Sequence, residues 1–409
     1  MLSDAELVDR VRSRLVTSGA PPTRAAVAAA LRHEGGVRGD NEIAAVLARL
    51  ESELVGAGPL EGLLRDPQVT DVLVNAPDEV WVDRGAGLER ARLRLAGEEG
   101  LRRLAQRLAA ASGRRLDDAQ PFVDARLPGG VRLHAVLPPV SPRGTTLSLR
   151  VPRRQVFSLR ELTAVGSVPP ALARLLALVV HTHLAFVISG GTGSGKTTLL
   201  SALLGETDSG DRVLLVEDSG ELRPSCPHVV RLEARGANAE GAGEVTLRDL
   251  VRQALRMRPD RIVVGEVRGA EVVDLLSALN TGHEGGCGTV HANSAADVPA
   301  RLEALGAVAG MSRAALHSQL ASALDLGIHL RRGADGLRRV EEIVLLETGA
   351  DGLVRTVDAL TVVDATLRPG RGAQALHRLL GARGAPAADL AACGLIEAPR
   401  THQPQFPRP

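Results

Sequence analysis

The chain contains a single lysine, Lys196, among its 49 Lys and Arg residues. It stands in GGTGSGKTT, residues 190–198, which fits the pattern G-x-x-x-x-G-K-[ST]. The compact ammonium of a flexible lysine side chain can bind between two phosphates, whereas the larger, planar guanidinium of arginine does not fit there. A Gly-rich turn with an incidental lysine would not explain why the lysine occurs only here. The pattern therefore predicts a phosphate-binding loop for a nucleoside triphosphate.

The residues on both sides of this loop have the order that such a loop requires. The apolar run Leu184–Ile188 predicts a buried strand before the glycines, and a helix is expected to begin near Lys196. Glycines let backbone amides turn toward an anion, and the helix N-terminus adds partial positive charge. We expect Thr197 to ligate Mg²⁺ and Thr198 to cap or line the phosphate pocket. The expected nucleotide-binding residues are Gly190, Gly191, Thr192, Gly193, Ser194, Gly195, Lys196, Thr197 and Thr198.

Two further apolar strands end in acidic residues. Ile262–Val264 leads to Glu266, and Val213–Val216 leads to Glu217 and Glu221. Ligands of open α/β sheets bind at the carboxyl ends of the strands, so these acids are expected beside the loop. One such acid would be explained as a helix cap, but two strands of this kind favour a site. Glu266 is the candidate for polarising the attacking water, while Glu217 or Glu266 would support Mg²⁺ through water, with Glu221 assisting.

A third polar segment, residues 281–294, is rich in glycine and carries His283 and His291. A histidine near each end of a Gly-rich loop suggests a sensor of the γ-phosphate, although structural histidines are equally compatible with the pattern. A metal site formed with Cys287 is disfavoured by the spacing of the two histidines.

Five segments follow from the hydrophobic pattern. Residues 1–55 predict a helical N-terminal region, 56–150 an α+β domain, 151–160 a linker, 161–345 an α/β domain with a parallel sheet, and 346–409 a C-terminal extension with a disordered end. In the α+β domain, apolar residues alternate with polar ones along two strands. Arg132 and Arg150 therefore lie opposite the core face, where they could meet another domain or subunit.

The charge, aromatic content and cysteine spacing of the chain indicate which partners it binds and in which compartment it lies. The formal net charge is +1 and aromatic residues make up 1%, so direct binding of nucleic acid is not expected. Three widely spaced cysteines indicate a reducing compartment. The N-terminal residues include acids and no apolar run, so we expect no signal peptide. No stretch has the roughly 18 uninterrupted apolar residues of a membrane span, so we expect a cytoplasmic protein that reaches membranes through partners.

Four ordered segments resemble secretion-system traffic ATPases of the type II/IV superfamily. They are GGTGSGKTT, VEDSGELR, RMRPDRIVVGEVRG and TGHEGGCGTVHANS. The upstream stretches LVGAGPLEGLLRDPQVTDVLVNAPDEVWVDR and VDARLPGGVRLHAVLPP resemble the CpaF/TadA branch, which powers assembly of Flp (tight-adherence) pili. The four-cysteine zinc module of the type II secretion and pilus-extension branch is missing, which also favours the Flp and conjugation branch.

The resemblance implies a fold and an assembly. It implies a RecA-like P-loop ATPase domain preceded by a PAS-like domain, with ATP and Mg²⁺ held between them. It further implies a homo-hexameric ring that is peripheral to the inner membrane through platform proteins. Hydrolysis of ATP would then drive Flp/Tad-type pilus assembly or type II/IV-like secretion.

The resemblance also assigns residue roles. Glu266 becomes the Walker-B acid, Glu217–Glu221 the Asp box, and His283 and His291 the histidine box. Arg132 and Arg150 match arginines that this family brings to the γ-phosphate from the N-terminal domain, and the weaker candidates for that role are Arg231, Arg235 and Arg268. Gly265 stands where many P-loop NTPases carry a metal-binding Asp, so Mg²⁺ would depend on Thr197, waters and the Asp box.

Two other functions stay open at this point. One is a RecA-like nucleic-acid translocase or a conjugal DNA-transfer ATPase, which low charge and few aromatics disfavour where direct contact with DNA is required. The other is a regulatory ring subunit that binds ATP and barely hydrolyses it, which the full set of acids disfavours.

Overall fold

The computed structural model describes residues 56–393 except 86, 128, 153–155, 238–241 and 283, together with residue 395 and isolated positions between 10 and 33. The helices predicted for 1–55 and the disordered end predicted after His402 lie almost entirely outside the described residues. The chain forms two compact units, Met1–Arg154 and Gln155–Pro409. The division between them falls within the predicted linker, residues 151–160.

In the described part of the first unit, six strands form an antiparallel sheet in the order β3-β2-β1-β6-β5-β4. The strands are β1 (Asp71–Ala76), β2 (Glu79–Asp83), β3 (Leu88–Arg90), β4 (Phe122–Arg126), β5 (Arg132–Val136) and β6 (Thr146–Arg150). The helical elements are η1 (Gly58–Leu60), α4 (Glu61–Arg65) and α5 (Gly97–Ala111).

One face of this sheet forms the core of the first unit. Leu133 on β5 and Leu149 on β6 are buried with the apolar stripe of α5, as the alternation predicted. Arg132 and Arg150 are direct cross-strand neighbours and are both exposed on the other face. The predicted orientation of these two arginines is therefore confirmed.

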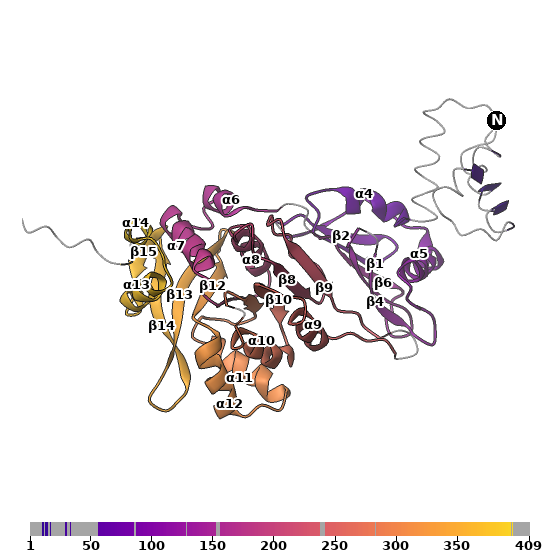
Figure 1. The fold of residues 1–409 in the computed structure, drawn as a ribbon. Helices are drawn as coiled ribbons and strands as arrows, with labels where there is room; N and C mark the ends of the chain where they lie inside the picture. Colours follow the sequence, from indigo (N-terminus) through magenta and orange to yellow (C-terminus); the bar gives the residue numbers. More distant parts are fainter. Residues whose placement is uncertain are drawn as a thin grey trace, which may run out of the picture. The chain divides into compact units, whose positions relative to one another are not determined.

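The second unit contains a nine-stranded sheet in the order β15-β14-β13-β12-β7-β11-β10-β8-β9 (Figure 1). The strands from β12 to β9 in that order are parallel, as expected, whereas β13, β14 and β15 are antiparallel, so the sheet as a whole is mixed. The strands are β7 (Phe186–Gly190), β8 (Val213–Glu217), β9 (Val229–Glu233), β10 (Arg261–Val267), β11 (Cys287–Val290), β12 (Leu326–Arg332), β13 (Arg338–Thr348), β14 (Val354–Val363) and β15 (Thr366–Pro369).

Helices cover both faces of this sheet, because successive residues of the buried strands point to opposite sides. Ile188 packs in one core and Val187 in the other. The first core is shared by α6 (Leu159–Ala164), α7 (Pro170–His181), α8 (Lys196–Leu204), α13 (Ala373–Ala382) and α14 (Ala387–Ala392). The second is shared by α9 (Leu247–Ala254), α10 (Glu271–Leu279), α11 (Val298–Val308) and α12 (Arg313–Ala323) (Figure 1). In the described part of the chain, no helix is both long and apolar enough to span a bilayer.

The structure differs from the predicted C-terminal boundary. The expected end of the ATPase domain at 345 falls inside β13, and residues from there to Ala392 continue the same sheet and core. The apolar run at residues 343–346 of β13 has charged residues on both sides, and Arg355 and Asp358 interrupt the apolar residues of β14. These antiparallel strands therefore lack the uniformly buried pattern of β7 and β8. Much of the segment that the sequence suggested to be an extension is thus part of the second unit.

Candidate functional site

The phosphate-binding loop connects β7 to α8, as predicted. Gly190, Gly193 and Gly195 have φ values of 149°, 70° and 97°, a region that side chains with a β-carbon rarely adopt. A β-carbon at Gly190 would lie 2.5 Å from the backbone oxygen of Leu330 on β12. Both the backbone conformation and the close approach of β12 therefore require glycine at the start of the loop.

Lys196 is buried at the first position of α8, with its side chain folded back into the loop. Its Nζ donates hydrogen bonds to the backbone oxygens of Gly190 and Gly191, both at 3.0 Å, and lies 3.4 Å from His291 Nδ1. Burial lowers the pKa of the ammonium, and the charge of Glu266 opposes that shift. The ammonium thus lies where an incoming phosphate could replace the two carbonyl oxygens.

Glu266 lies near the carboxyl end of β10, where the sequence predicted it. Arg268 Nη2 donates to Glu266 Oε2 at 2.5 Å, and His291 Nε2 lies 2.9 Å from Oε1 without the alignment of a hydrogen bond. Burial alone would raise the pKa of Glu266, but the hydrogen bond from Arg268 and the charges of Arg268, His291 and Lys196 lower it overall. The carboxylate is therefore ionised at neutral pH and can accept a hydrogen bond from a water molecule.

Glu217 has an environment that its predicted metal-supporting role did not anticipate. It is buried, and its Oε1 accepts hydrogen bonds from the backbone N–H groups of Glu221 and Leu222, both at 2.9 Å. A β-carbon at Gly265, on the neighbouring strand, would lie 2.8 Å from Glu217 Cγ. The side chain of Glu217 thus occupies the space beside Gly265 and anchors the turn after β8, which explains why position 265 carries no larger residue.

Burial raises the pKa of Glu217 to about 7 from an ordinary value of 4.5. The folded protein therefore holds this proton more tightly than the unfolded chain, so this group's contribution to stability is full below pH 4.5 and is lost as the pH rises to about 7. Glu217→Gln stays neutral at every pH. We therefore expect the unfolding free energy of this variant, minus that of wild type, to rise by about 2–3 kcal/mol from pH 5 to pH 8.

Urea unfolding of the nucleotide-free protein at both pH values measures this effect. The matched control is Glu347→Gln, which removes an exposed carboxyl group on β13. A stability difference between Glu217→Gln and wild type that is the same at pH 5 and pH 8 would show that Glu217 is ionised in the folded protein at both pH values.

The site contains buried oxygens that fit a nucleotide with its metal. Ser194 Oγ, Glu217 Oε2 and Glu266 Oε1 are inaccessible to solvent and have no hydrogen-bond partner among the described residues. Buried polar atoms normally have partners, and these three lie in the phosphate loop and at the carboxyl ends of β8 and β10. A hydroxyl can donate to a phosphate, and carboxylate oxygens can accept from water bound to Mg²⁺. Thr197, which we predict to ligate Mg²⁺, is half-buried next to Lys196.

One of the two histidines of the histidine box lies within the described residues. His291 follows the carboxyl end of β11 and lies at the phosphate loop, whereas His283 lies outside the described residues. Glu284, which precedes β11, pairs with Arg383. A γ-phosphate sensor made of both histidines therefore stays a prediction, with His291 at the phosphate loop.

The predicted arginines have different surroundings. Arg268 lies in the site, bonded to Glu266 and 3.7 Å from Asp218. Arg231 is exposed on β9, and Arg235 donates to the backbone oxygen of Gly243. Arg132, in the first unit, pairs with Asp124 through both Nε and Nη2. Of the weaker candidates, Arg268 is the one that the structure places beside Glu266.

Sequence reasoning missed Arg338 on β13. Its Nε donates to the backbone oxygen of Gly193 at 2.7 Å, so a strand far along the chain contacts the phosphate loop. The sequence offers no signal for this contact, since Arg338 is one of several arginines in a charged stretch.

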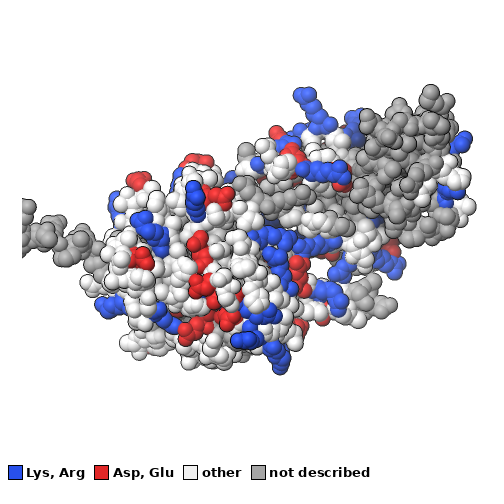
Figure 2. Space-filling view, turned by 45° about the horizontal axis from the view of Figure 1, so that its top comes forward, with Lys and Arg blue, Asp and Glu red and all other residues white. Residues whose placement is uncertain are grey.

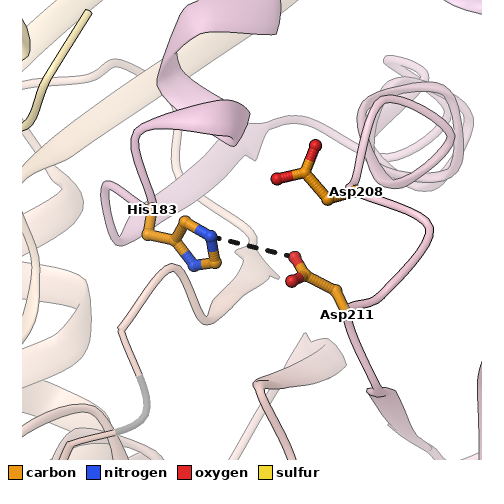
Figure 3. Close-up of side chains that lie close together, drawn as sticks. All are labelled: His183, Asp208 and Asp211. Atoms are coloured by element: carbon orange, nitrogen blue, oxygen red, sulfur yellow. Dashed lines mark ion pairs between the residues drawn. The ribbon is translucent and has the colours of Figure 1, made fainter.

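A second polar cluster lies at the amino ends of β7 and β8, where His183, Asp208 and Asp211 approach one another (Figure 3). His183 Nε2 is 3.9 Å from Asp211 Oδ2, and the same oxygen accepts from the buried Nε of Arg261 at 2.7 Å. A divalent cation there would face the guanidinium of Arg261 across a shared carboxylate. We therefore interpret the group as the exposed end of a buried ion pair that connects α7, β8 and β10.

Comparisons with known proteins place the chain among relatives. The family described as type II/IV secretion system protein matches residues 53–359, more than half of the chain. A putative conjugal transfer protein of Mycobacterium tuberculosis is 59% identical over 351 residues, which cover 84% of this chain and 99% of that protein. A probable conjugal transfer protein TrbB of Sinorhizobium fredii is 32% identical over 296 residues, 71% of this chain and 86% of its own.

Among solved structures, the pilus retraction motor PilT with bound ADP matches with a TM-score of 0.52 and 21% identity. The match covers 72% of this chain and 83% of that one. At this level of identity the likeness shows the fold alone, a mixed α/β architecture with an N-terminal antiparallel sheet.

Proposed function

Because the chain belongs to the type II/IV secretion system protein family and is an ATPase of that family, we propose that it is the motor of an assembly or export machine. The observation that carries this proposal is the continuous set of contacts around one loop. Lys196 Nζ lies 3.4 Å from His291 Nδ1, and His291 Nε2 lies 2.9 Å from Glu266 Oε1. The ammonium, the imidazole and the ionised carboxylate of these three residues thus lie together where the phosphates of ATP would bind.

Each of these residues has a role in the proposed reaction. Lys196 exchanges its bonds to the loop carbonyls for oxygens of the β- and γ-phosphates, as in other phosphate loops. Glu266 accepts a hydrogen bond from the attacking water and orients it. Thr197, with Glu266 or Glu217 through water, would hold Mg²⁺, which neutralises phosphate charge when bound. Arg268 and His291 hold the carboxylate of Glu266 in position.

The second unit is then the RecA-like domain of the motor and the first unit its PAS-like domain. We propose that the motor is a homo-hexamer that reaches the inner membrane through platform proteins. Arg132 and Arg150 would approach the γ-phosphate in such a ring. Their adjacent positions on the exposed face of the first unit support this role, and Arg132 would exchange Asp124 for phosphate.

The proposal also concerns which machine the ATPase powers and which molecules it moves. Resemblance of residues 54–84 and 123–139 to the CpaF/TadA branch favours assembly of Flp pili. Two relatives described as putative or probable conjugal transfer proteins favour a conjugation machine instead. We propose that this ATPase acts on protein components of either machine, because its low net charge and few aromatic residues disfavour direct contact with nucleic acid. Comparing pilus formation and DNA transfer in a deletion strain, complemented with wild type or Lys196→Ala, distinguishes the two.

Direct translocation of nucleic acid is the competing function. Figure 2 shows Lys and Arg interspersed with Asp and Glu on one face of the second unit, rather than a field of one sign. With a net charge of +1, we expect double-stranded DNA to change the ATPase rate by less than about twofold at both 50 mM and 200 mM salt. Stimulation of about tenfold or more that disappears at the higher salt concentration would establish a nucleic-acid motor instead.

A further inference from the structure

The hairpin of β12 and β13 lies along the phosphate loop. Leu330 on β12 is the register partner of Gly190, the last residue of β7. Arg332 on β12 pairs with Arg338, the first residue of β13. The turn between these two strands therefore extends beyond the end of β7, toward the side on which the loop lies.

Arg338 makes two contacts with the loop. Its Nε donates to the backbone oxygen of Gly193 at 2.7 Å. Its aliphatic portion packs on Gly195, where a β-carbon would lie 3.1 Å from Arg338 Cδ. The side chain thus holds one peptide group of the loop and covers the glycine that precedes Lys196.

The orientation of that peptide group determines where an N–H points. The carbonyl of Gly193 and the N–H of Ser194 belong to one planar trans peptide and point in opposite directions. Because the carbonyl is turned to Arg338, the N–H of Ser194 faces the interior of the loop, where it donates to the backbone oxygen of Gly191 at 3.3 Å. Lys196 Nζ donates to the same oxygen.

We propose that Arg338 is a positioning residue for the nucleotide: by holding the carbonyl of Gly193 outward, it keeps the N–H of Ser194 directed at the phosphates. The inference rests on the proposed nucleotide site. A peptide flip would place a carbonyl oxygen against the phosphates instead of an N–H, and phosphate loops bind through inward-facing amides. The N–H of Ser194 would contact the phosphates equally in bound ATP and in the transition state. Losing this contact should therefore weaken nucleotide binding and leave the chemical step unchanged.

The test uses substitutions at 338 in the full chain. In Arg338→Ala, we expect the KM for ATP and the Kd for ADP to rise about tenfold, while kcat changes by less than about threefold. Arg338→Gln places an amide nitrogen at the position of Nε without the charge. If the hydrogen bond to Gly193 is what matters, Arg338→Gln recovers an affinity within about threefold of wild type.

The matched control is Arg339→Ala, which removes the neighbouring arginine, paired with Asp335 and not with the loop. We expect it to leave KM, Kd and kcat unchanged. Thermal unfolding verifies that each variant folds, and Arg338→Met, of similar length, replaces the Ala variant if that one does not.

Three results overturn the inference. Wild-type affinity in Arg338→Ala or Arg338→Met shows that the contact does not position the loop. An Arg338→Gln variant as weak as Arg338→Ala shows that the charge acts, and not the hydrogen bond. If the wild-type chain binds neither ATP nor ADP, the proposed function itself is wrong. The first two results would contradict the role of Arg338 alone and leave the proposed function intact.

Discussion

Replacing Lys196 by alanine is expected to lower kcat/KM for ATP hydrolysis by at least about 100-fold. The buried ammonium is directed at two loop carbonyl oxygens that phosphate oxygens would replace. Without it, the negative charge that develops on the phosphates loses its nearest cation in a site shielded from water. Phosphate release at saturating and limiting ATP measures the loss.

Lys196→Arg sharpens this result, because it keeps the charge and changes only the shape of the cation. We expect it to be nearly as inactive as Lys196→Ala, since the guanidinium is larger and planar and Lys196 is buried. Arg355→Ala, which breaks an exposed ion pair with Asp351, is the control for loss of a surface cation and should hydrolyse ATP at the wild-type rate. Wild-type activity in Lys196→Ala would place the nucleotide elsewhere.

Replacing Glu266 by glutamine is expected to reduce kcat by at least about 100-fold while the Kd for ATP stays within about threefold of wild type. The amide keeps the size of the side chain but loses the ionised oxygen that would accept a hydrogen bond from water. Its partners Arg268 and His291 lower the pKa of the carboxyl group, so the acid is already ionised at neutral pH. Single-turnover hydrolysis and equilibrium binding separate the two quantities.

The exposed Glu347→Gln substitution is the control for Glu266→Gln, and we expect normal turnover from it. If Glu266→Gln instead weakens ATP binding as strongly as it slows hydrolysis, its role is to shape the site and not to orient the water. If Glu217→Gln alone abolishes turnover while Glu266→Gln does not, the two acids have exchanged the roles proposed for them.

Local chemistry made the centre of the site predictable. The glycines and the lysine come directly after the buried strand β7, and Glu266 lies near the carboxyl end of the buried strand β10. A parallel sheet brings the carboxyl ends of such strands together. The structure confirms that Lys196, Glu266 and His291 are neighbours. The burial of Glu217 could not be predicted, because it depends on the space beside Gly265 on another strand.

The outer parts of the second unit were less predictable for a related reason. The strands β13 and β14 pair antiparallel near one side of the sheet, and the charged residues that flank or interrupt their apolar runs resemble those of a surface segment. Arg338 contacts a residue 145 positions away, and nothing in its local sequence distinguishes it from Arg339. Contacts of this kind arise from tertiary pairing, which a pattern within one segment does not contain.

Phosphate release by the purified full chain with Mg²⁺ and ATP, compared among wild type, Lys196→Ala, Glu266→Gln and the double variant, tests the central claim most directly. Residues that act on one bound nucleotide are not additive, so the double variant should be about as slow as the slower single variant. We predict steady turnover by wild type and losses of at least about 100-fold in each variant. Equal rates in all four proteins would contradict the assignment of this loop and of Glu266 to an ATPase site.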